Sequence, residues 1–123
     1  MSDIVVTVPK TFAYAGKVGL AAWAAEGDLP GDEWSGNDSH FYMGGQVPDI
    51  KPGERVYIVC EGKLRGYAPL VRIERYGQGR FALVRRGGAV AVTIDEPITG
   101  FRGFRYIWWK REDERPFLNW REV

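Results

Sequence analysis

The sequence predicts an α+β fold, a small mixed β-barrel of about six strands with one or two helices, in one domain over residues 1–123. Three observations lead to this fold class. Short runs of β-branched and aromatic residues recur along the chain, and turns rich in glycine and proline separate them. Apolar residues near the N-terminus instead recur at helical spacing. The number of these strands, about six, favours a closed barrel, because closure removes exposed strand edges.

The first predicted elements are a strand and a helix. Residues 4–8 read IVVTV, a short β-branched run that is typical of a strand. Thr11 is a suitable N-cap for a helix over residues 12–26. Gly16 and Gly19 weaken this helix, since glycine costs about 1 kcal/mol relative to alanine inside a helix. The apolar face of the helix consists of Val18, Ala21, Ala22 and Ala25.

The rest of the chain predicts a loop and then strands. Residues 27–39 are turn-rich and acidic, and we interpret them as a loop long enough to be functional. Residues 51–76 predict two strands joined by a tight turn. Gly66 and Pro69 lie within the second strand and indicate a bulge or bend, which barrel strands need in order to curl. Further strands are predicted over residues 81–84, 89–94 and 104–110.

Residues 52–74, PGERVYIVCEGKLRGYAPLVRIE, resemble the barrel centre of the PUA-like superfamily, which includes the ASCH, EVE and YTH domains. Those domains similarly place a Pro-Gly-Asp/Glu corner, a hydrophobic strand, a turn and a glycine-containing strand at this position. The resemblance implies a pseudo-barrel with a cleft that binds RNA, a modified base or a small nucleoside-like ligand. ASCH amidohydrolases use a Lys-Thr-Glu set, but the spacing of Lys10, Thr11 and Glu74 differs, so these residues receive no role.

Residues 101–111, FRGFRYIWWKR, interleave aromatic and basic side chains. Arginines pair with phosphates, and aromatic faces stack bases. On a strand, Arg105 and Trp109 share one face, and we interpret this row as the one that faces a ligand. Trp109 would then stack the ligand, while Arg102 and Arg105 neutralise phosphate. The opposite row, predicted to pack in the core, is Phe104, Tyr106 and Trp108. The alternative for the arginines is that they are only solvated.

The acidic loop contains a second group of candidate ligand-binding residues. Few apolar residues lie near Trp34 in the sequence, so we expect this side chain either to pack into the core or to form the wall of a pocket. Ser35 and Asn37 offer hydrogen-bonding groups that can read the edge of a base. In the functional interpretation, Trp34 stacks the ligand over the barrel mouth and faces Tyr42 or Trp109. The alternative is an ordinary surface loop.

The charge of the chain is distributed unevenly, although its net value is only +1. Residues 1–61 carry a net charge of −5, and residues 62–123 carry a net charge of +6. This split indicates either an anionic partner for the second half or attraction between the two halves within one fold. Five arginines on neighbouring predicted strands form a phosphate-tracking surface if they share a face, and are otherwise merely solvated: Arg72, Arg75, Arg80, Arg85 and Arg86.

Several classes of catalytic and metal site do not fit this sequence. One histidine, His40, and one cysteine, Cys60, make a zinc site implausible, and we predict no metal and no cofactor. A Cys60–His40 nucleophile pair is conceivable, but Cys60 alternates with Val56 and Ile58, which favours a buried, inert thiol. The absence of a signal peptide, a membrane span and a disulfide pair predicts a cytoplasmic protein.

These observations favour binding over catalysis. We predict a module that holds RNA, a modified base or a nucleotide-like ligand in a cleft lined by aromatic residues and arginines, without assigned catalytic residues. The predicted ligand-binding residues are Trp34, Ser35, Asn37, Tyr42, Arg102, Arg105 and Trp109. One alternative is a small amidohydrolase acting on a modified nucleoside, with a lysine beside a carboxylate in its pocket. Another is a protein-interaction module that presents exposed tryptophans.

Overall fold

The computed structural model describes residues 2–9, 11, 13–14, 16–19, 38–86 and 89–116. Strands dominate the regular structure of this part of the chain. They are β1 (Ile4–Thr7), β2 (Ala13–Tyr14), β3 (Lys17–Val18), β4 (Ser39–Gly44), β5 (Arg55–Cys60), β6 (Lys63–Tyr76), β7 (Arg80–Arg85), β8 (Val92–Thr93), β9 (Phe104–Tyr106) and β10 (Arg115–Pro116). A short 3-10 helix, η1 (Arg111–Asp113), precedes β10.

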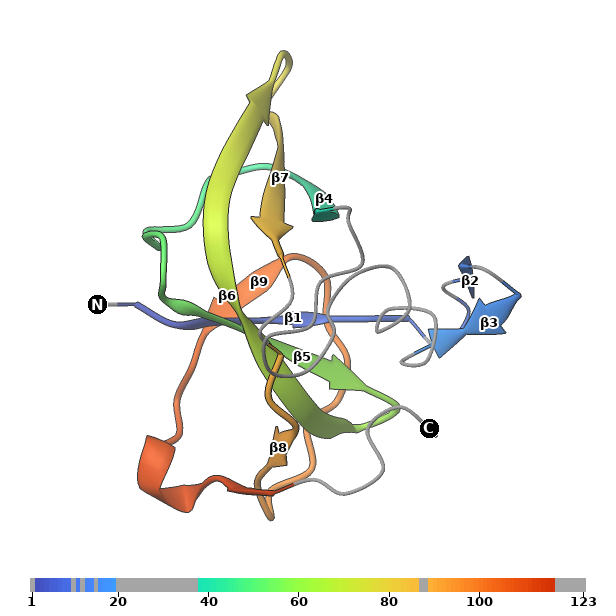
Figure 1. Ribbon diagram of the computed structural model, residues 1–123, viewed down its shortest axis with the longest axis vertical. Helices are drawn as coiled ribbons and strands as arrows, with labels where there is room; N and C mark the ends of the chain where they lie inside the picture. Colours follow the sequence, from blue (N-terminus) through green and yellow to red (C-terminus); the bar gives the residue numbers. More distant parts are fainter. Residues whose placement is uncertain are drawn as a thin grey trace.

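One sheet with the strand order β4-β7-β6-β5-β1-β9 organises the molecule. β1 and β5 are parallel, and the other neighbouring pairs in this sheet are antiparallel. The sheet curls into a half-barrel, and the long strand β6 runs along most of its height (Figure 1). The first half of β6 pairs with β5 and the second half pairs with β7. β6 therefore connects the two halves of the curl.

Two irregularities in pairing lie along β6. The register with β5 skips Arg65, next to Gly66, which adopts a φ of 156°. A second shift in register occurs opposite β7 between Leu70 and Arg72, just after Pro69. A bulge of this kind adds one residue to a strand, bends it and increases its twist. The bulge or bend predicted from Gly66 and Pro69 is confirmed, and it explains how one strand can serve both halves of the sheet.

The predicted α+β fold class is wrong, because the expected helix over residues 12–26 begins as a β-hairpin. β2 and β3 pair there in an antiparallel register that places Tyr14 opposite Lys17. Gly16, in the turn between these strands, adopts a φ of 78°, whereas a right-handed helix requires negative φ. The remaining predicted positions, residues 20–26, lie outside the described residues. The described fold is mostly β, and none of its helices is long and apolar enough to cross a membrane.

The half-barrel buries both faces of its central strand, β5. Val56, Ile58 and Cys60 pack into a first core on one face, whereas Tyr57 and Val59 pack into a second core on the other. All five residues are at most 1% exposed. Burying a Val or Ile side chain stabilises a protein by about 1.5–3 kcal/mol relative to leaving it exposed. The alternation predicted for this strand is confirmed, and Cys60 is a buried thiol.

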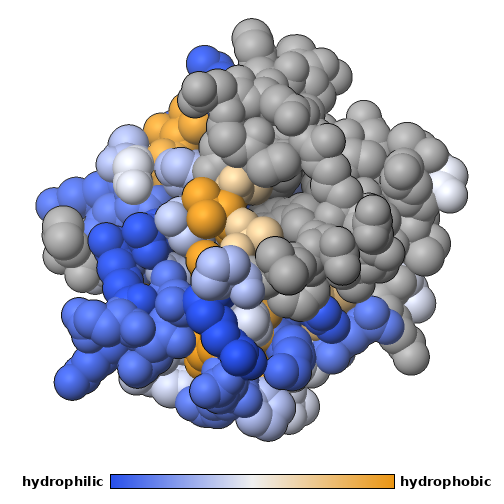
Figure 2. All heavy atoms as spheres, turned by 60° about the horizontal axis from the view of Figure 1, so that its bottom comes forward, coloured by the Kyte–Doolittle hydropathy of each residue, from blue (hydrophilic) through white to orange (hydrophobic). Residues whose placement is uncertain are grey.

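The second core is covered by the chain that follows β7. Ile94, Ile98 and Trp109 belong to it and are at most 9% exposed. β8 and β10 pair with each other beside this core. On the side of the molecule that carries β8 and η1, hydrophilic side chains cover most of the described surface, with smaller apolar areas between them (Figure 2). The second core is thus buried beneath a mainly polar surface.

The curl brings the two outermost strands of the sheet, β4 and β9, toward each other. Among the described strands, β4 pairs only with β7, and β9 pairs only with β1. Gly103 immediately precedes β9, and a Cβ atom added to it would lie 4.0 Å from Cε of Met43 in β4. The two edges therefore face each other across a short gap, which we name the seam.

Candidate functional site

A pocket of about 290 Å³ opens at the seam, and we name it the seam pocket. Residues 41–44 of β4 form one wall. Residues 101–103, in the loop that precedes β9, form the facing wall, and Thr7 and Pro9 at the end of β1 complete the lining. The pocket therefore joins segments that lie far apart in the sequence. It exists because the sheet curls without β4 and β9 pairing.

Contacts with β1 hold the 101–103 wall in place. Oγ1 of Thr7 accepts a hydrogen bond of 3.1 Å from the backbone N–H of Phe101. Gly100 packs so closely that an added Cβ would lie 3.1 Å from Cγ2 of Thr7, a crowded distance. Gly103 adopts a φ of 72°, which glycine reaches without steric cost. These contacts direct Phe101 and Arg102 toward the pocket.

The lining combines aromatic rings with a positive charge. Phe41 and Phe101 are half-buried, whereas Tyr42 remains 62% exposed and Arg102 is exposed. The guanidinium of Arg105 lies 4.5 Å from the centroid of the Phe101 ring, a cation–π contact that limits the positions available to this ring. The seam pocket can therefore stack a flat ring and pair with an anion, which are the two chemistries predicted from the sequence.

The structure brings three of the seven predicted ligand-binding residues to the seam. Tyr42 and Arg102 line the pocket, and Arg105 contacts it through Phe101. Trp109 lies elsewhere, in the second core. Its Nε1–H donates a 2.9 Å hydrogen bond to Oε2 of Glu114. The other predicted residues, Trp34, Ser35 and Asn37, lie outside the described residues.

The two rows predicted for residues 104–110 need a correction. β9 ends at Tyr106, so the alternation of a strand does not continue to Trp108 and Trp109. Phe104 packs against the first core as expected, but Tyr106 and Trp108, from the same predicted row, are 48% and 45% exposed. The buried tryptophan is Trp109, which the sequence pattern placed on the ligand side. A strand of three residues cannot impose a period of two on the residues that follow it.

A buried polar cluster that no local sequence pattern indicated anchors Trp109. Besides the Trp109 bond, Oε2 of Glu114 accepts a 2.6 Å hydrogen bond from the hydroxyl of Tyr57. Arg55 lies 3.3 Å from the other oxygen of Glu114 and 4.1 Å from the centroid of the Tyr67 ring. Burial and the adjacent Glu114 carboxylate raise the pKa of Tyr57 well above its ordinary value. The cluster stabilises the fold and lies in the second core.

A second polar cluster lies on the solvent-facing side of β4, β7 and β6. Asp38 accepts hydrogen bonds from Arg86 at 2.7 Å and from Arg72 at 3.3 Å. Glu74 accepts bonds from Arg72 at 2.6 Å and from the hydroxyl of Tyr76 at 2.8 Å. The hydrogen bond from Arg86 is the main cause of the lowered pKa of Asp38. The Tyr76 hydroxyl and then Arg72 lower the pKa of Glu74, which in turn raises the pKa of Tyr76 to about 12.

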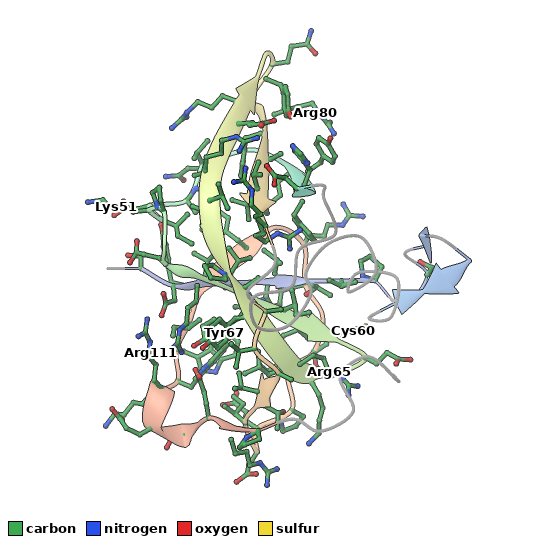
Figure 3. All side chains as sticks on the ribbon, in the orientation of Figure 1. Lys51, Cys60, Arg65, Tyr67, Arg80 and Arg111 are labelled. Carbon is green, nitrogen blue, oxygen red and sulfur yellow. The ribbon has the colours of Figure 1, made fainter. Side chains whose placement is uncertain are left out.

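These ion pairs engage two of the five arginines that were predicted to form a basic surface. Arg72 and Arg86 bind carboxylates, and Arg85 is fully buried, so the five arginines do not form one phosphate-tracking face. Pairs such as Asp38–Arg86, and Asp3–Arg111 at 2.7 Å, join the acidic half of the chain to its basic half. Figure 3 shows Arg111 beside η1. Attraction between the two halves therefore accounts for part of the charge asymmetry.

Among the described residues, neither the Cys60–His40 nucleophile pair nor a cluster suited to a metal ion is formed. Cys60 lies in the first core on β5, and His40 lies on β4 with its Nε2 3.3 Å from Oε1 of Glu74. Two strands, β6 and β7, separate β4 from β5 in the sheet. In the part of the chain that the structure describes, no three His, Cys, Asp or Glu residues are arranged to hold a metal ion.

A second pocket of about 230 Å³ lies against the second core and includes Trp109. Its polar lining consists of the carboxylates Asp95, Glu96 and Asp113. Neither this pocket nor the seam pocket places a lysine beside a carboxylate, which is the arrangement that the amidohydrolase alternative requires. Of these two pockets, the seam pocket, with Arg102 at its wall, is better suited to an anionic ligand.

Comparison of this chain with protein-family models, with curated proteins and with solved structures gives no match. The resemblance of residues 52–74 to PUA-like domains therefore stays a prediction.

Proposed function

We propose that this protein is a binding module that holds one base of RNA, a modified base or a small nucleotide-like ligand in the seam pocket. The observation that carries the proposal is the meeting of Tyr42, Phe101 and Arg102 around one pocket. Aromatic faces stack bases, and the guanidinium of arginine pairs with phosphate oxygens.

The size of the pocket supports a ligand of one nucleotide unit. Its volume of about 290 Å³ is close to the lower end of the range for ligand pockets, roughly 300–1,000 Å³. Met43 and Phe41 supply apolar contacts, and the hydroxyl groups of Thr7 and Tyr42 supply the polar groups that orient a ligand. Small residues on both walls, Gly44 and Gly103, leave room for a ring between the two strand edges.

The contact between Arg105 and Phe101 assists binding in this proposal. A ring that is already restrained loses less freedom when a base stacks on it, so less of the interaction energy is spent on ordering the site. Arg105 is exposed and adds a second positive charge beside Arg102. The cleft implied by the PUA-like resemblance leads to the same class of ligand.

The test is calorimetric titration of the protein with nucleosides and nucleoside 5′-monophosphates, plain and base-modified, at low and moderate salt. We expect saturable binding that weakens with salt, because neutralised phosphates release counterions. Arg102→Gln should weaken monophosphate binding about tenfold or more, the effect of losing a charged hydrogen bond. Arg75→Gln is the matched control, because Arg75 is an exposed arginine outside the pocket lining.

Two results would contradict the proposal. One is the absence of binding by any ligand in this set to folded protein. The other is equal weakening by Arg102→Gln and Arg75→Gln, which would assign the effect to net charge rather than to the seam pocket. Association that does not depend on salt, with itself or with a protein partner, would instead favour the protein-interaction alternative.

A further inference from the structure

An aromatic row lies on the solvent-facing side of β4, β7 and β6, next to the seam pocket. His40 and Tyr42 lie two residues apart on β4 and therefore point to the same face of the sheet. The pairing register places Tyr42 level with Glu74 of β6, across β7, and Tyr76 of β6 level with Arg80 of β7. The rings of His40 and Tyr42 are stacked, with centroids 5.8 Å apart and planes 17° apart. The centroids of Tyr42 and Tyr76 lie 6.1 Å apart. We name His40, Tyr42 and Tyr76 the aromatic row.

The two tyrosines of the aromatic row are exposed although their side chains are large. Tyr42 is 62% exposed and Tyr76 is 44% exposed. Beneath them on β7, Ala82 and Val84 are fully buried, so the rings extend outward from a closed layer. Such a row offers flat aromatic faces to solvent and does not contribute to either core.

The rings are held in position by the polar cluster around Glu74. Oε1 of Glu74 accepts the 2.8 Å hydrogen bond from the Tyr76 hydroxyl and lies 3.3 Å from Nε2 of His40. Nδ1 of His40 lies 3.1 Å from the backbone oxygen of Asp38. Because Glu74 is itself fixed by Arg72, two of the three rings are restrained before any ligand arrives. Preorganised rings bind a stacked base with a smaller loss of side-chain entropy.

Positive charge lies at the end of this face. Arg75 and Arg80 are close to the turn between β6 and β7, where Figure 3 shows Arg80 near the tip of the hairpin. Both are exposed, and among the described residues neither has a carboxylate within salt-bridge distance. Tyr76 is directly paired in register with Arg80. A phosphate beside a base stacked on Tyr76 would lie close to these charges.

Tyr42 belongs both to the seam pocket and to the aromatic row. A ligand held in the pocket is therefore adjacent to an exposed surface that repeats the same combination of flat rings and arginines. A single nucleotide would leave this surface unused, whereas a strand would follow it, since successive bases stack on successive aromatic side chains.

We propose that the aromatic row is a second binding surface, on which the nucleotides that adjoin the one in the seam pocket stack, so that the ligand is a single-stranded nucleic acid. This inference rests on the proposed function of the seam pocket. It assigns roles to Tyr76 and Arg80, which the pocket alone does not require.

The experiment compares binding of a nucleoside 5′-monophosphate with binding of short, fluorescein-labelled single-stranded RNA and DNA oligomers of mixed sequence. Tyr76→Ala should weaken oligomer binding about fivefold or more, the lower end of the contribution of one stacked base. The same variant should leave monophosphate binding unchanged. Tyr76→Phe keeps the ring, loses the hydroxyl and should retain most of the oligomer affinity. RNA and DNA are titrated separately, and binding of either one supports the inference.

Two further variants complete the design. Tyr106→Ala removes another half-exposed tyrosine, on β9 and away from the aromatic row, and should leave oligomer affinity unchanged. Arg102→Gln should weaken both the monophosphate and the oligomers. Thermal unfolding of every variant establishes that a loss of binding is not a loss of folding.

The outcomes separate the two proposals. If Arg102→Gln weakens both ligands while Tyr76→Ala binds oligomers like the wild type, the seam pocket stands and the aromatic row is overturned. If the monophosphate binds and oligomers bind no more tightly than it does, the row is again overturned. If folded protein binds neither ligand, both proposals are overturned.

Discussion

The second core and the seam use the same kinds of side chain for opposite purposes. In the second core, Trp109 and Tyr57 donate hydrogen bonds to the carboxylate of Glu114, and both residues are at most 9% exposed. At the seam, Tyr42 and Arg102 face an open pocket. One segment, residues 101–111, supplies both regions, with Phe101 and Arg102 at the seam and Trp109 in the core. An aromatic and arginine-rich composition therefore does not identify a ligand site; what distinguishes the two regions is burial, because Tyr57 and Trp109 are at most 9% exposed whereas Tyr42 is 62% exposed.

The largest expected effect tests the structural side of this comparison. Trp109→Ala should destabilise the protein by about 3–5 kcal/mol, because it removes a buried aromatic side chain and leaves a cavity. The molecules that remain folded should bind ligand like the wild type. Chemical denaturation and calorimetric titration check the two parts. Trp108→Ala is the control, because Trp108 is 45% exposed and should cost far less. If the Trp109→Ala protein were stable but had lost ligand binding, Trp109 would belong to the ligand site and the account would be wrong.

A somewhat smaller loss of stability is expected for Glu114→Ala. The change leaves the Tyr57 hydroxyl and the Trp109 indole N–H buried without their acceptor. One unsatisfied buried donor costs about 1–3 kcal/mol, and we expect a total of about 2–4 kcal/mol. Glu112→Ala, at an exposed position of η1, should change the free energy of unfolding by less than about 0.5 kcal/mol. Equal effects of the two variants in urea unfolding would show that the Glu114 cluster does not anchor the chain.

A substitution at the seam should weaken ligand binding while leaving the free energy of unfolding nearly unchanged. Phe101 is half-buried, so we choose Tyr42→Ala as the variant that alters the pocket and spares the core. It should weaken binding of a nucleoside 5′-monophosphate about fivefold or more through the loss of one stacking face. Its free energy of unfolding should change by less than about 1 kcal/mol. Titration and denaturation of the same preparation test both statements. A large loss of stability without a loss of affinity would reverse the distinction drawn between the two regions.

The smallest expected effect concerns the polar cluster beneath the aromatic row. Folding lowers the pKa values of Asp38 and Glu74 from their ordinary values of 3.8 and 4.5. A carboxyl group with a lowered folded-state pKa contributes stability that is fully present above its ordinary pKa and is lost as the pH falls through the folded-state pKa. Stability should therefore fall below about pH 4.5.

Glu74→Gln should reduce that dependence on pH, because glutamine does not titrate in this range. Urea unfolding midpoints measured from neutral pH into the acid range provide the check, with Glu96→Gln as a control at an exposed carboxylate. Parallel pH curves for the wild type and Glu74→Gln would show that the ion pairs of this face contribute no stability. Because the cluster lies near the surface, the difference between the curves should be small.

Local signals in the sequence predicted the centre of the fold. The alternation of Val56, Ile58 and Cys60 predicted which face of β5 enters the first core, and Gly66 and Pro69 indicated where β6 bends. These features depend on neighbouring residues alone. The β2–β3 hairpin was missed because Gly16 was weighed as a cost to a helix rather than as the residue with positive φ that forms a turn.

The candidate site was less accessible to sequence reasoning. β4 was not predicted as a strand, and nothing local indicates that residues 41–44 lie beside residues 101–103. That approach is set by the curl of the whole sheet, including both bulges in β6. Trp109 was assigned to a ligand because a strand was extended beyond Tyr106, where the structure ends it. Glu114 lies in a run of charged residues, REDER, and nothing in that run indicates that its side chain is only 6% exposed.

The most direct test of the central claim is an amide chemical-shift titration of isotope-labelled protein with a nucleoside 5′-monophosphate. The seam pocket predicts that the amide signals of residues 41–44 and 101–103 shift in a saturable way, while the indole N–H signal of Trp109 stays in place. Shifts confined to Trp109, Asp95 and Glu96 would place the ligand in the second pocket and contradict the account. The absence of any shift in folded protein would contradict it as well.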